Sequence, residues 1–577
     1  MLSELSIGHV TLAIFLVWCV NRLLTIGSRQ SGLPPGPPTI PFLGNLHIFP
    51  KVSTHLRFTD WAKLYGGLYS LKMGTSTAVV LSNPRVVHKL LHLRSSTTSD
   101  RPSIHFNDIT SGGLNLVLAP YNNTWRSMRQ VVKDMLSHDA CMNHLPTQRA
   151  EATQLMHDLL VGPAAFYTHV RRYSNSVILS LVFGVRCARY EGSLVEEFYE
   201  VQRMWADNLE PGALPPIDII PLLRYLPESW APWKGLSREI RSRQRSLYFG
   251  LVERCRRRIQ SGCRNNCFME SVLDRQEQYN LDDEMLAYTG GIVMEAGSDP
   301  VAIFLQSFIF CLAAFPEVQV RAREELDKVV GRDRSPRFED FKNLPYCDAI
   351  IKEASVPTFD TDLYAHQCIN YRSTDSALLR PRESPISRPQ MKSPSQIDGY
   401  TVPKGSVVFM NIWGIGHDAE SFEHPHVFHP ERFLQSEFGT KKGADNRDRR
   451  HDTAFGSGKV CTIPAISVID GAHLSPLSSQ RICPAIEFAN NSIILNVMNL
   501  LWGFEFQPAK NPQTAKPIPI DLDAMTNGLL SAPKPFLCDI RPRSEMHAEI
   551  IRSAFLEARA TFRQFEKEST KREVRGM

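Results

Sequence analysis

Two cysteines late in the chain, Cys461 and Cys483, have neighbours whose types and spacing could support chemistry. Cys461 follows a Gly-rich run, AFGSGK, and Cys483 lies in RICPA, directly before an apolar segment with helical spacing. A helix that starts just after a cysteine directs the positive end of its dipole at the sulfur, which favours the metal-ligating thiolate. A cysteine considered alone is more often a core residue than a ligand. The surrounding pattern reverses that expectation for Cys483.

Residues 460–480 separate two halves of one motif. Without them, FGSGK from Phe455 would continue as RICPA from Arg481, in the form Phe-x-x-Gly-x-Arg-x-Cys-Pro-Ala. This string resembles the haem-ligand loop of the cytochrome P-450 family. The resemblance implies haem b as the cofactor, Cys483 as the axial thiolate on its iron, and Phe455 and Arg481 as residues that contact it. Such a thiolate pushes electron density toward O–O cleavage.

Trp125 and Arg129 stand four residues apart in TWRSMRQVVKDML, so a helix here places both side chains on one face. An indole N–H and a guanidinium could together bind an anionic group such as a haem propionate. The alternative is a core Trp beside a surface Arg. The segment resembles a helix at the same place in the family, and we therefore expect both residues to bind the haem.

A long apolar helix is expected over residues 285–315, and its middle resembles the family's central helix over the haem. There an acid and an alcohol deliver protons to iron-bound dioxygen, and small residues leave room for the oxygen. The residues in these places are the catalytic pair Asp299 and Ser298 and the haem-contacting pair Ala296 and Gly297. The family usually has Thr after the acid, whereas this chain has Pro300, which lacks a hydroxyl and kinks a helix. A buried, Pro-kinked helix without a catalytic role is the alternative.

A second interrupted motif begins at Glu353. The family continues with Glu-x-x-Arg, an ion pair buried on one helix that must keep both partners. Here residues 355–378 intervene, and their removal makes Arg380 the partner of Glu353. Arg432, in the segment FHPERF, matches the family's third member of this core.

We hypothesise that residues 355–378 and 460–480 are translated introns, because both breaks fall inside motifs that are intact on either side, whereas insertions favour exposed loop tips. Val460 and Cys461 must be encoded GTN and TGY, consistent with a splice donor, and Gln480 can be CAG, an acceptor. A genuine insertion is the alternative.

The remaining elements must position these residues. The mostly apolar residues 7–26 are long enough to cross a bilayer, and Arg22 near their end with Arg29 beyond it places the rest of the chain in the cytoplasm. Prolines in residues 33–45 predict a stiff hinge. A strand pair is expected over residues 68–80 and a functional loop over residues 101–123. The expected domains are a membrane anchor (1–28), a hinge (29–48), a catalytic domain (49–540) and a charged C-terminal helix (541–577).

Composition narrows the function classes. A net charge of +5 is too small for a nucleic-acid footprint, so no nucleic-acid partner is expected. Twelve scattered cysteines show no disulfide or zinc spacing, which indicates a reducing compartment. The resemblance implies a mainly α fold with a small β region, in one large catalytic domain behind a transmembrane helix of the endoplasmic reticulum.

The resemblance also implies an activity. We expect a haem-thiolate monooxygenase of secondary metabolism that inserts one oxygen atom into a hydrophobic small molecule. NADPH would supply the electrons through NADPH-cytochrome P-450 reductase. Two alternatives stay open: a haem-thiolate isomerase or lyase that needs no external electrons, favoured by Pro300, and an inactive, haem-free chain if both interruptions are real.

Overall fold

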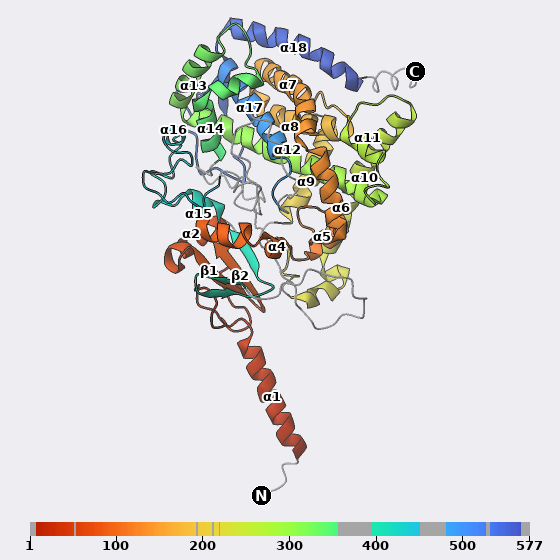
Figure 1. Ribbon diagram of the computed structural model, residues 1–577, viewed down its shortest axis with the longest axis vertical. Helices are drawn as coiled ribbons and strands as arrows, with labels where there is room; N and C mark the ends of the chain where they lie inside the picture. Colours follow the sequence, from red (N-terminus) through yellow and green to blue (C-terminus); the bar gives the residue numbers. More distant parts are fainter. Residues whose placement is uncertain are drawn as a thin grey trace.

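The computed structural model describes residues 7–50, 53–191, 194–209, 213–218, 220–355, 395–450, 481–526 and 531–566. Most of the molecule consists of packed α-helices, and a small β-sheet region lies at one end of the helical part (Figure 1). This confirms the mainly α class with a small β part. Phe455, Cys461, Arg380, residues 356–378 and residues 460–480 lie outside the described residues.

The helices run from the N-terminal α1 to the C-terminal α18. The α-helices are α1 (Ile7–Thr25), α2 (Thr54–Tyr65), α3 (Pro84–Val87), α4 (Ser95–Thr98), α5 (His105–Ser111), α6 (Asn123–Met135), α7 (His138–Val161), α8 (Phe166–Phe183), α9 (Leu194–Asp207), α10 (Pro232–Gln260), α11 (Phe268–Leu273), α12 (Asp283–Ala314), α13 (Pro316–Val329), α14 (Pro345–Ser355), α15 (Ile412–Gly416), α16 (Arg432–Gln435), α17 (Ile486–Gly503) and α18 (Glu545–Glu566). Shorter turns are the π-helical η2 (His88–His92) and the 3₁₀ helices η1 (Leu46–Ile48), η3 (Pro163–Ala165), η4 (Pro221–Tyr225), η5 (Glu228–Trp230) and η6 (Phe338–Asn343). The helix α5 lies inside the stretch 101–123 that the sequence predicted as a loop, so that prediction was wrong in this part.

The strands form three small sheets. They are β1 (Leu68–Met73), β2 (Ser76–Leu81), β3 (Ser395–Ile397), β4 (Tyr400–Val402), β5 (Val407–Met410), β6 (Phe504–Pro508) and β7 (Cys538–Pro542). The expected strand pair is confirmed: β1 and β2 pair antiparallel around Gly74, whose φ of +60° suits glycine. The distant strand β5 then pairs parallel to β2, with Ala78 opposite Val407 and Leu81 opposite Met410.

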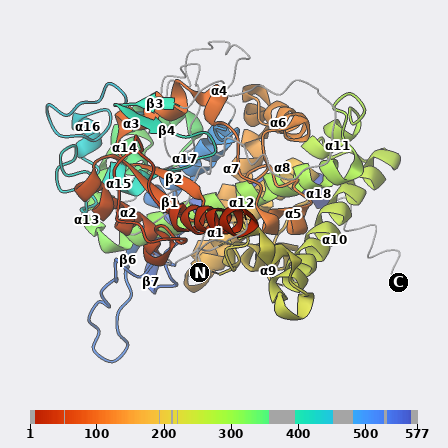
Figure 2. The same ribbon diagram turned by 90° about the horizontal axis from the view of Figure 1, so that it is seen from below.

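The helix α12 lies at the centre of the helical part, with β1 and β2 on one side of it and α9, α10 and α11 on the other (Figure 2). It starts at an N-cap, where the Asp282 side chain accepts from the Met285 N–H at 2.7 Å. It is apolar nearly all round, which is the pattern of a buried helix. Its length and apolar composition would also allow it to cross a membrane, yet 78% of its most apolar window is buried in the core.

The Pro-rich segment after α1 is held against the sheet. Arg29 donates from Nη1 to the Pro34 carbonyl at 2.9 Å and from Nη2 to the Ser70 carbonyl of β1 at 3.1 Å. The Asn45 amide donates to the Pro38 carbonyl at 2.9 Å. The expected hinge is therefore docked on the sheet in this structure. Prolines keep the segment out of a regular helix, so its carbonyls are available to accept hydrogen bonds from Arg29 and Asn45.

The helix α18 lies across α7, at the end of the molecule opposite α1 (Figure 1). Its residues Ile551 and Phe562 are each 2% exposed, and the Phe555 ring stacks on the His157 ring at 4.0 Å. The apolar face of α18 therefore docks on the domain. The boundary differs from the expectation, because Arg541 belongs to β7 and the helix begins at Glu545.

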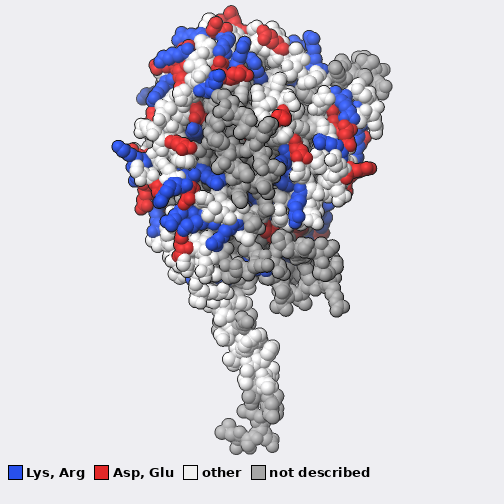
Figure 3. All heavy atoms as spheres, in the orientation of Figure 1, with Lys and Arg blue, Asp and Glu red and all other residues white. Residues whose placement is uncertain are grey.

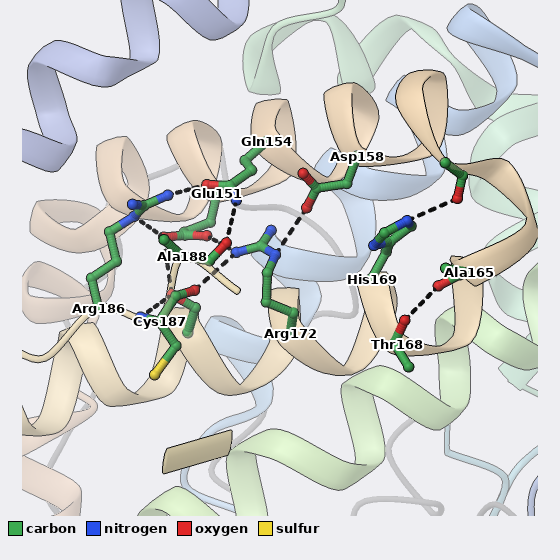
Figure 4. Close-up of polar contacts among 12 residues, drawn as sticks. Glu151, Gln154, Asp158, Ala165, Thr168, His169, Arg172, Arg186, Cys187 and Ala188 are labelled. Atoms are coloured by element: carbon green, nitrogen blue, oxygen red, sulfur yellow. Dashed lines mark hydrogen bonds and ion pairs between the residues drawn. The ribbon is translucent and has the colours of Figure 1, made fainter. Parts of the chain in front are cut away.

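A buried ion-pair network joins α7 to α8 (Figure 4). Arg172 of α8 bonds Glu151 at 2.6 Å and Asp158 at 2.9 Å, and Arg186 bonds Glu151 at 2.7 Å. The Arg172 and Glu151 side chains are 2% and 0% exposed, so each charge depends on its partner. The network fixes the spacing of the two helices that support α12 and α17.

Candidate active site

The cysteine Cys483 lies three residues before α17, at the positive end of that helix's dipole. Burial raises the pKa of its thiol, while the backbone N–H of Ala485 and the Arg129 guanidinium act to lower it. The local sequence explains the geometry, because Pro484 and Ala485 make the turn that leads into the helix. The arrangement provides a sulfur whose negative charge is supported by one N–H donor, one cation and a helix terminus.

The helix α6 carries Arg129 to this cysteine. Its N-cap is Asn122, whose side chain accepts from the Trp125 N–H at 2.7 Å. Arg129 donates from Nη2 to the Ile482 carbonyl, in the residue before Cys483. Burial lowers the pKa of Arg129, and the nearby Cys483 opposes that shift. Arg129 therefore contacts the loop that carries Cys483, while its predicted contact with the haem stays a prediction.

The indole of Trp125 has another partner than the one expected. Its N–H donates to the Leu116 carbonyl at 2.9 Å, so this donor is already occupied. The Arg481 guanidinium lies 4.2 Å from the centre of the Trp125 ring, and Arg129 lies 6.0 Å from it. Arg481 also donates to the Ser99 carbonyl at 2.8 Å. The indole therefore serves as a platform for two arginines rather than as a hydrogen-bond donor to a ligand.

The middle of α12 turns its polar residues in different directions. Ala296 is exposed, although it stands inside an otherwise buried helix. A Cβ at Gly297 would lie 2.7 Å from the Ile178 side chain, so this glycine lets α8 approach closely. Ser298 is fully buried, and its hydroxyl accepts from the Asn175 amide of α8 at 3.0 Å. Ser298 thus faces α8, whereas Ala296 lies on the exposed side.

The acids of α12 have unusual pKa values. Burial raises the pKa of Asp299 to about 6, against the opposing effect of Arg171. Burial and the nearby Asp299 raise the pKa of Glu295 to about 7, although hydrogen bonds from Tyr248 and Gln244 oppose this. The Gln244 amide donates to Glu295 at 3.1 Å, and the Tyr248 hydroxyl donates to the same oxygen. Sequence reasoning missed Glu295, but an acid within an apolar helical run is a signal that could have found it.

The core pair forms between Glu353 and Arg432. Glu353 Oε2 lies 3.1 Å from Arg432 Nε, and the backbone N–H of His429 donates to Glu353 Oε1 at 2.9 Å. Burial raises the pKa of Glu353 to about 7, and Arg432 counteracts the shift. The expected third member, Arg380, lies outside the described residues, so its pairing with Glu353 stays a prediction.

Comparison with known proteins identifies the family. The sequence model of the family Cytochrome P450 matches residues 34–354 and 383–461. A cytochrome P450 monooxygenase of Armillaria gallica is 41% identical over 556 residues, covering 96% of this chain and 98% of that protein. The cytochrome P450 monooxygenase yanC of Aspergillus niger is 35% identical over 541 residues, covering 92% and 93%. The chain belongs to the cytochrome P450 family.

The fold agrees with a solved structure. A zebrafish cytochrome P450 with progesterone superposes with a TM-score of 0.63 at 20% identity, covering 85% of this chain and 99% of that one. The protein is accordingly a haem-thiolate monooxygenase, an oxidoreductase that acts on a small molecule with electrons from a redox partner. The family match omits residues 355–382 and ends at residue 461, so it includes Cys461 and not Cys483.

Proposed function

We propose that Cys483, rather than Cys461, ligates the haem iron of this monooxygenase. The observation that carries the proposal is the Cys483 sulfur beside Arg129, with the Ala485 N–H and the start of α17 directed at it. This donor set suits a haem thiolate, because backbone N–H groups and a nearby cation support a charged sulfur in a buried place. When bound, the haem supplies the activation of dioxygen with two electrons from the redox partner.

The chain's own residues hold and neutralise the cofactor. Arg129 and Arg481, both supported by the Trp125 ring, supply positive charge for the propionates. Ala296 keeps the haem-facing side of α12 free of a bulky side chain, whereas Gly297 lies against Ile178 of α8. Phe455 belongs to the ligand loop by its place in the motif. The Asp299 carboxyl, with a pKa of about 6, holds a proton that can be given up near neutral pH. Ser298 contributes less to proton delivery than Asp299, because its hydroxyl already accepts a hydrogen bond from Asn175.

We propose further that residues 355–378 and 460–480 are absent from the working enzyme. The gap in the family match after residue 354 and its end at residue 461 fall beside these segments, which supports the idea. Removing residues 460–480 joins the Gly-rich run directly to Arg481. Sequencing the mature transcript tests this, and a predominant message that encodes residues 460–480 overturns it.

A membrane location is also proposed, with α1 as a single anchor in the endoplasmic reticulum, the catalytic domain in the cytoplasm and NADPH-cytochrome P-450 reductase as the redox partner. The helix α1 projects from the body (Figure 3), carries no Lys, Arg, Asp or Glu before Arg22 near its end, and exposes Phe15 and Val17 at 57% and 69%. The yellow turns η4 and η5 lie at the same end (Figure 1), and their residues Tyr225 and Trp230 are 85% and 73% exposed. Exposed aromatic residues of this kind suit a membrane interface.

The relatives are fungal monooxygenases, which supports a role in secondary metabolism with an apolar substrate. The ligand assignment is tested with Cys461→Ala and Cys483→Ala in the full chain, and with Cys483→Ala in the chain without residues 460–480, which has no Cys461. The reduced, carbon-monoxide-bound protein is expected to show a thiolate-type Soret band in Cys461→Ala and to lack it in Cys483→Ala. The reverse result assigns the iron to Cys461 and overturns the proposal. If every chain that retains residues 460–480 lacks haem, the interrupted chain is an inactive product. That result is distinct from one in which the haem binds but Cys483 is not its ligand.

A further inference from the structure

The helix α12 runs without interruption from Asp283 to Ala314, and Pro300 lies inside it. A proline has no backbone N–H, so Pro300 has no hydrogen to donate to the carbonyl four residues earlier, which is that of Ala296. The Ala296 carbonyl therefore lacks the donor that residue 300 supplies in a regular helix. Pro300 adds no side-chain donor of its own.

Ala296 and Pro300, being four residues apart, share one face of α12. Ala296 is exposed, and Pro300 is half-buried. The nearby polar side chains are engaged elsewhere, since Glu295 bonds Tyr248 and Gln244 of α10 and Ser298 bonds Asn175 of α8. The exposed face of this turn therefore combines apolar side chains with one backbone acceptor and the carboxyl of Asp299, three residues after Ala296.

We propose that the Ala296 carbonyl, released by Pro300, binds a hydroxyl group of the substrate. The substrates are then apolar molecules that carry a free alcohol or phenol. A site built around such a bond discriminates against an analogue without the hydroxyl, because that analogue displaces water from the carbonyl without replacing its hydrogen bond. This inference rests on the proposed function, in which the Ala296 face of α12 is the one beside the haem.

The chain offers sharply matched variants. Pro300→Ala restores a backbone N–H for the Ala296 carbonyl and adds nothing else, while Pro300→Thr restores the N–H and adds a hydroxyl. Both replace a residue that a helix interior disfavours, so both are expected to fold. Pro146 is a second proline inside a helix, α7, and it is exposed, so Pro146→Ala controls for the general effect of removing a helical proline.

Ligand affinity is measured by equilibrium dialysis and by the ligand-induced shift of the haem spectrum, neither of which requires turnover. The probes are two pairs in which a methyl group replaces the hydroxyl: 4-tert-butylphenol with 4-tert-butyltoluene, and 1-decanol with undecane. The wild-type protein and Pro146→Ala are expected to bind the hydroxyl member about tenfold more tightly, the effect of one hydrogen bond. Pro300→Ala is expected to lose most of that preference.

Equal affinities within both pairs for the wild-type protein, including no measurable binding by any probe, overturn the proposal. So does a preference that persists unchanged in Pro300→Ala. If the wild-type protein shows no preference while Pro300→Ala alters peroxide release, water occupies the carbonyl and the substrate proposal is wrong. All measurements use protein that has passed the carbon-monoxide test with Cys483 as ligand, so a failure of the hydroxyl proposal is distinguishable from a failure of the ligand assignment.

Discussion

Glu353 at the end of α14 and Arg432 at the start of α16 form an ion pair of 3.1 Å, with 1% and 10% of their side chains exposed. Arg432 Nη2 also donates to the Val427 carbonyl at 2.7 Å, so one side chain ties the loop before α16 to the helix α14. The pair joins two segments separated by more than seventy residues. Because both charges are withdrawn from water, neither is tolerated without the other.

Arg432→Ala is therefore expected to destabilise the fold strongly, by about 3–5 kcal/mol, because it removes the cation that faces the buried carboxyl of Glu353. Thermal unfolding and haem content after purification measure the effect. Arg203→Ala, which breaks an exposed pair with Asp207, serves as the control and is expected to change little. Equal unfolding temperatures for the two variants would contradict the role given to Arg432.

Glu295 predicts a pH dependence of stability. Its pKa is raised from the ordinary 4.5 to about 7, so the native state binds this proton more tightly than the unfolded state. The unfolding free energy should then fall as pH rises from about 4.5 to about 7, by roughly 3 kcal/mol in total, and level off above. Glu295→Gln lacks this contribution. Chemical unfolding of both proteins across this range measures the difference, and parallel curves would refute it.

Asp299→Asn should reduce NADPH-supported product formation by about 100-fold, because an amide cannot supply the proton that the carboxyl holds. Ser298→Ala should retain most activity, since its hydroxyl is committed to Asn175. Product and peroxide are measured together, with the Soret spectrum as a check on folding. A larger loss in Ser298→Ala than in Asp299→Asn would reverse the assignment of these two residues.

Phe562→Ala should loosen α18. The ring is 2% exposed and lies 3.4 Å from the Arg186 guanidinium, which also pairs with Glu151 in the network of Figure 4. Loss of this buried ring is expected to cost about 3–5 kcal/mol. Leu556→Ala on the same helix, 63% exposed, is the matched control. Limited proteolysis after residue 544 and thermal unfolding report the change, and indistinguishable behaviour would show that α18 contributes nothing to stability.

Much of the fold could be predicted from patterns among residues close together in the sequence. The apolar run of α12 and the strand pair around Gly74 were both predicted from the sequence, because periodicity shows which face is buried. The Glu353–Arg432 pair was also predicted, through the resemblance of its two short motifs.

The hydrogen-bond partners of individual side chains could not be predicted from such local patterns. Spacing placed Ser298 beside Asp299, but the residue that takes its hydroxyl, Asn175, comes from another helix more than one hundred residues away. The same holds for Trp125, whose N–H is taken by a backbone carbonyl that no motif marks. The partners of Glu295 lie on α10, so only the packed structure brings them together.

The parallel pairing of β2 with β5 has a consequence for biosynthesis. About 330 residues separate the two strands, and at roughly 5–20 residues per second their translation takes on the order of 15–65 seconds. During that time the edge of β2 that will pair with β5 has unpaired backbone N–H and C=O groups, and exposed strand edges of this kind favour aggregation. Completion of this sheet is thus a late event on the ribosome, and the yield of folded enzyme should respond to chaperone supply and to the speed of elongation.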